Sequence, residues 1–370
     1  MTPKGLPVPK SRASAFPQYD IITYFVPGST LIFLCGLFDR SINTDLLRLG
    51  KIQKVKYEAL ATELLKKSQI IVSDFDYSGI VIVFIFVLAS YLLGIAISTI
   101  SSLGIERGAI GRNGKYPLQV LFRNNTPFDF QAYLRYLTTF GQLPVSLFGS
   151  VSVALSLGLL LITLNSNIAW VIFCVLCILI VLQVLAFLIM LLGHDHTKEP
   201  DGNTRIILGL IYLPGLPVQL AIYFAKKLIE ANRELPSDVK KLFKSRYKKL
   251  TGLEFSTTTP DSFWLTYGLV RSYQPFGSSF LLYTLRSYRF ARNMGMSFYL
   301  AWVYISSSMI YLYAANRQSF PNLAGDLEND YVAYGIVYFA ASVVFTTRFL
   351  TLYYNTFSRN LVRMFILIDN

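Results

Sequence analysis

The sequence carries little charge. Only 15% of its 370 residues are charged, whereas 53% are hydrophobic, and a soluble domain has roughly 25% charged residues. Acidic residues are the scarcer kind, with 21 Asp and Glu against 34 Lys and Arg, so the formal charge is +13. These values argue against a water-soluble protein and favour a membrane protein, in which Lys and Arg collect in the cytoplasmic loops.

Cysteine and histidine are also rare. The three cysteines, Cys35, Cys174 and Cys177, all lie inside apolar runs, which excludes a disulfide framework in the loops. The two histidines, His194 and His196, are the only candidates for a metal site, and a protein zinc site normally has three or four ligands. We therefore expect no bound metal and no cofactor.

Long apolar runs are abundant and contain almost no ionisable residues. A run of about 18 residues or more is long enough to cross a bilayer as a helix. The absence of buried charge argues against a proton-coupled transporter or an intramembrane protease. Gln183 is the most polar deep residue and is expected to bond to a neighbouring helix. The sequence predicts an all-α protein with six transmembrane helices at 21–38, 79–97, 143–164, 168–193, 294–315 and 331–347.

The third and fourth spans are so close in sequence that they must form an antiparallel hairpin. A further apolar segment, 206–225, contains Pro214 and Pro217, which interrupt a helix, so we expect it to be re-entrant or interfacial. Six spans place more Lys and Arg inside than seven do, with both termini in the cytoplasm. The aqueous parts are then a tail at 1–20, an external loop at 39–78, cytoplasmic segments at 98–142 and 194–293, and a tail at 348–370.

Small residues recur at every fourth position of the second span. The repeat consists of Ser90, Gly94, Ser98 and Ser102. Small side chains on one stripe of a helix let another backbone approach closely. The stripe therefore predicts a helix-packing face, whose partner is either in the same chain or in a second copy or another membrane protein.

Basic residues concentrate in one segment of the larger cytoplasmic part. Leu242, Phe243 and Tyr247 alternate with them at helical spacing. We expect an amphipathic helix on the anionic lipid headgroups, at about 1 kcal/mol per cation, with these three side chains inserted below them. A solvated helix or a polyanion site are the alternatives, and nucleic acid is not needed to explain the charge. The cations are Lys240, Lys241, Lys244, Arg246, Lys248 and Lys249.

Three short motifs resemble those of a loose group of uncharacterised bacterial multi-pass membrane proteins. They are Phe25 to Gly28, the stretch from Gly94 through Ser102 to Arg107, and Tyr288 to Asn293. The resemblance implies a bacterial inner membrane and transfers no functional residue.

The sequence contains no recognisable catalytic constellation, so it predicts a non-enzymatic sensor, scaffold or effector component that acts through a basic cytoplasmic face. A channel or facilitator is the alternative, because Ser/Gly stripes and a proline break can line a pore. A membrane enzyme is the third hypothesis, and it would depend on residues such as His194, Asp195, His196 or Arg292.

Overall fold

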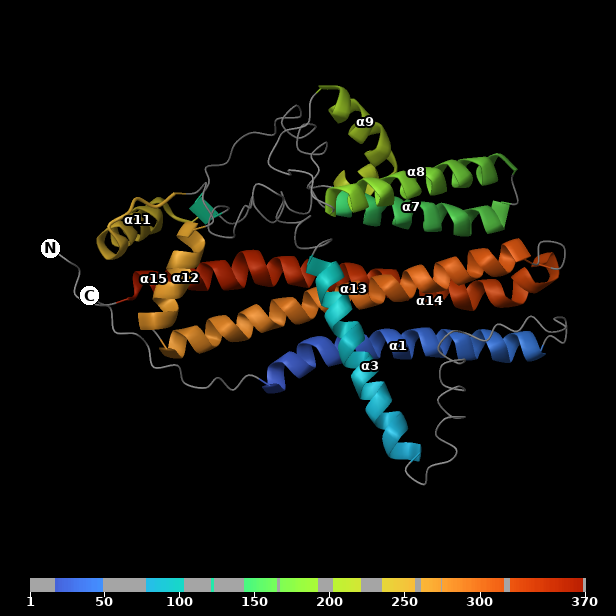
Figure 1. Ribbon diagram of the computed structural model, residues 1–370, viewed down its shortest axis with the longest axis horizontal. Coiled ribbons are helices and arrows are strands. Elements are labelled where there is room, and N and C mark those ends of the chain that lie inside the picture. Colours follow the sequence, from blue (N-terminus) through green and yellow to red (C-terminus); the bar gives the residue numbers. More distant parts are fainter. Residues whose placement is uncertain are drawn as a thin grey trace.

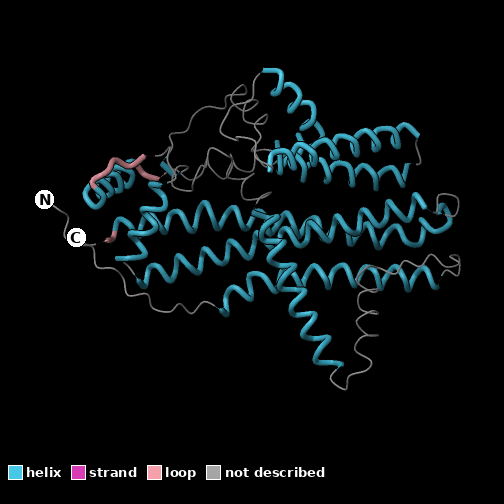
Figure 2. The backbone as a smooth tube through the Cα atoms, in the orientation of Figure 1, coloured by secondary structure: helices cyan, strands magenta, loops and turns pink. Residues whose placement is uncertain are grey.

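All regular structure in the described part of the chain is helical, as the sequence predicts, and no strand occurs there. Figure 2 shows helices throughout, with short loop segments mainly beside α11. The computed structural model describes residues 17–48, 78–102, 121–122, 143–164, 167–191, 202–220, 235–256, 261–273, 275–315 and 320–368.

Three long helices run along the long axis of the molecule (Figure 1): α1 (Pro17–Arg48), α13 (Pro275–Ala315) and α14 (Phe320–Thr351). A fourth, α3 (Ser78–Ser101), packs on α1 and α13 and leaves the bundle steeply. By length and composition, three described segments can cross a membrane: Ile22–Asp39, Val83–Ser101 and Ala333–Thr351.

The expected helical hairpin is present. Helix α7 covers Leu143–Leu164 and α8 covers Asn167–Leu191, within about two residues of the predicted bounds. The two helices pack against each other and run in opposite directions (Figure 1).

The proline-containing segment is broken where the sequence predicts. Helix α9 covers Gly202–Tyr212 and passes into a 3-10 turn, η3, at Leu213–Gly215. The turn packs on α7 so closely that a Cβ atom at Gly215 would lie 2.4 Å from the carbonyl oxygen of Ser146. The described part of the segment, which ends at residue 220, therefore lies against the beginning of α7.

Three helices extend well beyond the apolar windows that predicted them, and α14 begins at Phe320, ahead of the predicted span 331–347. Helix α1 continues to Arg48, into the expected external loop 39–78, and α13 begins at Pro275, inside the expected cytoplasmic segment 194–293. Hydropathy detects the stretch that matches hydrocarbon, whereas a helix continues in water wherever its residues favour helix and its buried face has a partner.

One end of the molecule is a compact group of helices around the first turns of α13, which we call the end domain. It contains α11 (Ser237–Thr251), α12 (Asp261–Tyr273) and α15 (Ser358–Ile366) (Figure 1). Helix α11 ends at Thr251, and Gly252 forms its C-cap with a left-handed φ of 72° and an N–H that donates to the carbonyl oxygen of Lys248. The fully buried aromatic side chains of the end domain are Phe243, Tyr247, Phe357 and Phe365.

A π-helical turn, η4 (Leu352–Phe357), joins α14 to α15. The side-chain hydroxyl of Ser358 donates a hydrogen bond to the carbonyl oxygen of Tyr353, five residues earlier, at 2.8 Å. A π-turn holds more residues than an α-turn, so it changes the direction in which the following side chains point. Here Tyr353 and Phe357 are both buried, and their rings stack.

Candidate functional site

The crossing of α1 and α3 is built on two glycines. A Cβ atom at Gly28 would lie 1.8 Å from the carbonyl oxygen of Ser90, and a Cβ atom at Gly94 would lie 1.8 Å from that of Tyr24. The two backbones are therefore in direct contact, which only glycine permits. This part of the small-residue stripe has its partner, α1, in the same chain.

A buried polar cluster lies at the end of this crossing, where α13 meets both helices. Asn293 is fully buried, and its Oδ1 accepts a hydrogen bond from Ser101 at 2.9 Å. Its Nδ2 donates to the carbonyl oxygen of Thr23 at 3.1 Å. Arg292 donates to Asn293 Oδ1 at 3.3 Å and to Ser98 Oγ at 3.0 Å. We call these residues the crossing cluster.

The crossing cluster joins polar residues of two of the three motifs named above, Ser98 and Ser101 of the second and Arg292 and Asn293 of the third. Arg292 lies 3.5 Å from the carbonyl oxygen of Ser98, near the carboxyl end of α3, where the helix dipole favours a cation. Ser297 donates to the carbonyl oxygen of Pro27 at 3.0 Å. Each of these bonds joins one helix to another, which favours a packing role for Arg292 over the catalytic one considered above.

A second polar link joins α1 to α13 farther along both helices. Asp39 is only 5% exposed, and its Oδ1 accepts a hydrogen bond from the Tyr304 hydroxyl at 2.7 Å. Phe38 packs edge-on against the Tyr304 ring. The sequence reading ended the first span at residue 38 and assigned Asp39 to a loop, so it missed this buried carboxylate.

The helical hairpin is tied to its neighbours by hydrogen bonds as well. Gln183 on α8 donates to Ser150 Oγ on α7 at 2.8 Å and to the carbonyl oxygen of Ile211 on α9 at 2.6 Å, so it links helices as expected. Ser152 on α7 is 3.1 Å from the Tyr299 hydroxyl on α13. These contacts attach α8 and α9 to the main bundle through α7.

The basic helix α11 turns its apolar face inward. Phe243 and Tyr247 are 0% and 2% exposed. The Phe243 ring lies 4.8 Å from that of Phe365 and 4.7 Å from that of Phe122. The prediction that Phe243 and Tyr247 insert below lipid headgroups is therefore wrong, because the end domain already covers them. Leu242 alone remains half exposed.

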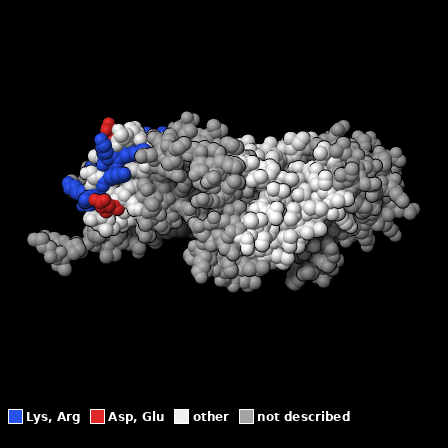
Figure 3. Space-filling model, turned by 90° about the horizontal axis from the view of Figure 1, so that it is seen from above, with Lys and Arg blue, Asp and Glu red and all other residues white. Residues whose placement is uncertain are grey.

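The outer side of α11 carries lysine. Figure 3 shows Lys and Arg gathered at this end of the molecule. Lys240 is half-buried, and Arg246 is turned inward to donate to the carbonyl oxygen of Ile368. The exposed lysines, which we call the basic face, are Lys241, Lys244, Lys248 and Lys249.

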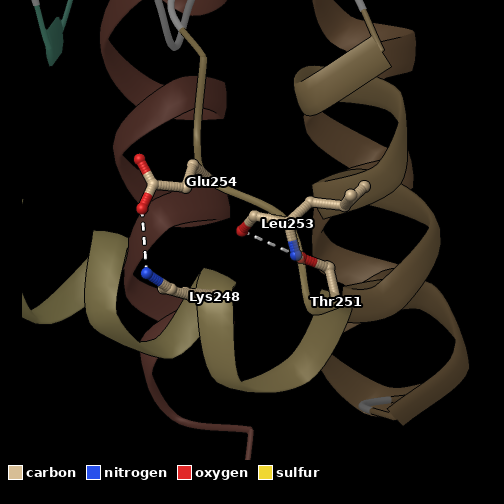
Figure 4. Close-up of polar contacts among 4 residues, drawn as sticks. All are labelled: Lys248, Thr251, Leu253 and Glu254. Carbon is tan, nitrogen blue, oxygen red and sulfur yellow. Dashed lines mark hydrogen bonds and ion pairs between the residues drawn. The ribbon is translucent and has the colours of Figure 1, made fainter.

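One lysine of the basic face has an acidic partner (Figure 4). Lys248 Nζ lies 2.9 Å from Glu254 Oε1, and both side chains are exposed. The bond raises the pKa of Lys248 and lowers the pKa of Glu254. Thr251 accepts a hydrogen bond from the Leu253 N–H at 3.1 Å, which fixes the turn that carries Glu254.

The candidate metal ligands His194 and His196, together with Asp195, lie outside the described residues. Among the residues that are described, no group of three or more His, Cys, Asp or Glu side chains is placed to hold a metal ion.

No protein-family model, curated protein or solved structure matches the chain. The resemblance to bacterial membrane proteins therefore remains an expectation.

Proposed function

We propose that the chain is a non-enzymatic, six-span protein of a bacterial inner membrane, with both termini in the cytoplasm. Its end domain faces the cytoplasm, meets a partner through the basic face, and passes the change in its position to the membrane helices. Passing a change from a bound partner to the membrane helices is the function of a sensor or effector component.

The observation that supports this proposal most is the length of α13. Its 41 residues form one unbroken helix, about 60 Å long. Leu281, near its beginning, is buried in the end domain, whereas Met296 and Trp302 are buried in the core with α1 and α7. One rigid element thus belongs to two separate cores.

A second connection runs beside the first. Helix α14 passes through η4 into α15, and Phe349 and Tyr353 pack against Tyr288 of α13. A rigid element that contributes to two packed cores can carry a displacement from one to the other. The two connections together favour the transmission of a movement, and not merely the tethering of the end domain.

Hydrogen exchange on the full-length protein in nanodiscs tests this coupling without any ligand. Loosening the end domain by Phe243→Ala should increase exchange in α13 beyond Arg292. Adding Ser287→Pro, which breaks the helix between the two cores, should confine the increase to the end domain. Leu242→Ala is the matched control at an exposed neighbour and should change neither region. The proposal fails if Phe243→Ala leaves α13 beyond Arg292 unchanged although α13 is intact.

Reporter fusions test the six-span topology. A periplasmic signal after Gly193 would show that the segment 206–225 crosses the membrane, and it would overturn the orientation of everything before it. We expect cytoplasmic signals after Gln142, Gly193, Gly252 and Asn370, and external signals near Ser68 and Gly325.

A facilitator for small polar solutes is the second candidate, and one observation favours it. Within the described residues, both polar atoms of Gln219 and the Oε1 of Gln183 are buried without a hydrogen-bond partner. Unpaired buried amides are costly and suit a path that polar molecules visit. Proteoliposomes should then release glycerol or urea faster than empty vesicles, and Gln219→Leu should remove the difference.

A further inference from the structure

The basic face lies beyond the end of the apolar segment of α14. The apolar segment of α14 ends at Thr351, and α11 packs on Phe365 of α15. The helical rise places Phe365 roughly 20 Å farther along the same rod. The headgroup layer is only about 5 to 8 Å deep, and charges are screened over about 8 Å at physiological salt. An inner leaflet at the end of α14 would therefore attract these lysines only weakly.

The shape of α11 is also unsuited to a membrane surface. A helix that lies on a leaflet inserts its apolar face between the lipids. In α11 this face, with Phe243 and Tyr247, is buried in the end domain. What remains outside is a ridge of four lysines, beside Asp238, Ser245 and the half-exposed Leu242, and its net positive charge suits a polyanion in solution.

The residue types on the ridge indicate which class of polyanion it binds. The central part of a protein interface is rich in aromatic residues and Arg and poor in Lys, whereas the basic face is all lysine and Arg246 is turned inward to Ile368. A small nucleotide needs a concave site, and one helix side is convex. Ammonium groups on a convex ridge match phosphates that are bound without reading bases.

We propose that the basic face binds the sugar-phosphate backbone of a nucleic acid, independently of its sequence. This inference rests on the proposed cytoplasmic position of the end domain, and it names the partner that the end domain meets through the basic face. Lys241, Lys244 and Lys248 occupy successive turns over about 10 Å, and double-stranded DNA presents one charge per roughly 1.7 Å of axis. Glu254 is exposed beside Lys248, so a phosphate group can replace the Glu254 carboxylate as the partner of Lys248.

The test uses the full-length protein in nanodiscs of neutral lipid and a fluorescent DNA duplex of mixed sequence. Binding should weaken with salt, with a slope of log K against log salt between about −2 and −4, because two to four phosphates are contacted. Lys241→Gln with Lys244→Gln should weaken binding about tenfold or more at low salt and reduce the slope by about 2.

A matched control removes the same charge elsewhere on the end domain. Arg271 on α12 and Arg363 on α15 are both exposed, and changing both to Gln should leave the slope unchanged. An equal loss in this control would mean that net charge, and not the basic face, binds the duplex, which overturns the proposal.

Three further results would overturn it: binding to none of the probes, binding to anionic-lipid vesicles but not to the duplex, or tighter binding to poly-glutamate than to the duplex. The last two would assign the face to a leaflet or to an acidic protein. Nanodiscs expose both sides of the protein, so this result does not depend on topology. The hydrogen-exchange test uses no ligand, so the failure of either proposal can be recognised separately.

Discussion

The end domain and the crossing of α1 with α3 are held together in opposite ways. In the end domain, large rings fill the core: Phe243, Phe357 and Phe365 are each 0% or 1% exposed. At the crossing, Gly28 and Gly94 bring two backbones into contact, and the apolar side chains from Val83 to Leu88 of α3 are exposed, that of Val83 by 62%.

This difference is the one expected if the end domain lies in water and the crossing in the bilayer, as proposed above. In water, rings are driven together because burying apolar area is favourable. Lipid gives no such drive between helices, so close approach and polar contacts hold them instead.

The largest effect is expected at the crossing. Gly94→Leu places a side chain where the Tyr24 backbone lies, and a backbone cannot move aside as a flexible side chain can. We expect the loss of monodisperse folded protein in size-exclusion chromatography. Val83→Leu, on the exposed side of α3, should elute as the unchanged protein does. Normal folding of Gly94→Leu would show that the contact between the backbones is not required.

The next effect is expected in the end domain. Phe365→Ala removes a ring that is 0% exposed and should reduce the free energy of unfolding of this region by about 3 to 5 kcal/mol. Leu367→Ala, two residues away and 66% exposed, should change it by less than about 0.5 kcal/mol. Proteolysis over a range of urea concentrations measures both, and equal effects would contradict the assigned core.

A smaller effect is expected from the crossing cluster. Asn293→Ala removes the acceptor for Ser101 and Arg292 and the donor to Thr23, at a cost of about 1 to 3 kcal/mol. Thermal unfolding in detergent should show a lower midpoint. Ser287→Ala, which removes an exposed hydroxyl bond to Tyr283, is the control and should leave the midpoint almost unchanged. If the two midpoints were equal, the cluster would not contribute to stability.

The smallest effect is expected at the exposed pair of Lys248 and Glu254. Because the pKa of Glu254 is lowered in the folded protein, the pair stabilises above the unfolded pKa of about 4.3, and this contribution is lost as the pH falls through the folded value. The melting-temperature difference between the unchanged protein and Glu254→Gln should thus be small at pH 6 and vanish once the pH is below the folded pKa of Glu254. High salt should reduce it further. A difference that grew at low pH would contradict the pairing.

Hydropathy and spacing predicted the helices better than their ends. The hairpin helices and the proline break follow from apolar runs and from prolines in the sequence. The continuation of α13 does not, because the partners that cover Leu281 come from distant parts of the chain.

The sequence also identified residues more readily than their roles. The small stripe on α3 could be recognised, but its partner could not, since glycines permit contact with any nearby backbone. The burial of Phe243 and Tyr247 depends on Phe122 and Phe365, which are far away in sequence. The burial of Asp39 was missed because the carboxylate is paired with the Tyr304 hydroxyl, and no local sequence pattern indicates that contact.

The number of residues in the π-turn η4 determines the direction in which the side chains of α15 point. Relative to an α-helix the turn accommodates an additional residue, so deleting one residue within Leu352–Phe357 would allow α14 and α15 to join as one regular helix. Each residue turns an α-helix by about 100°, so the deletion would swing Leu361 and Phe365 away from α11 without changing either side chain. The protein is therefore expected to be intolerant of a change in the length of this turn, even where its buried residues Tyr353 and Phe357 are left unchanged.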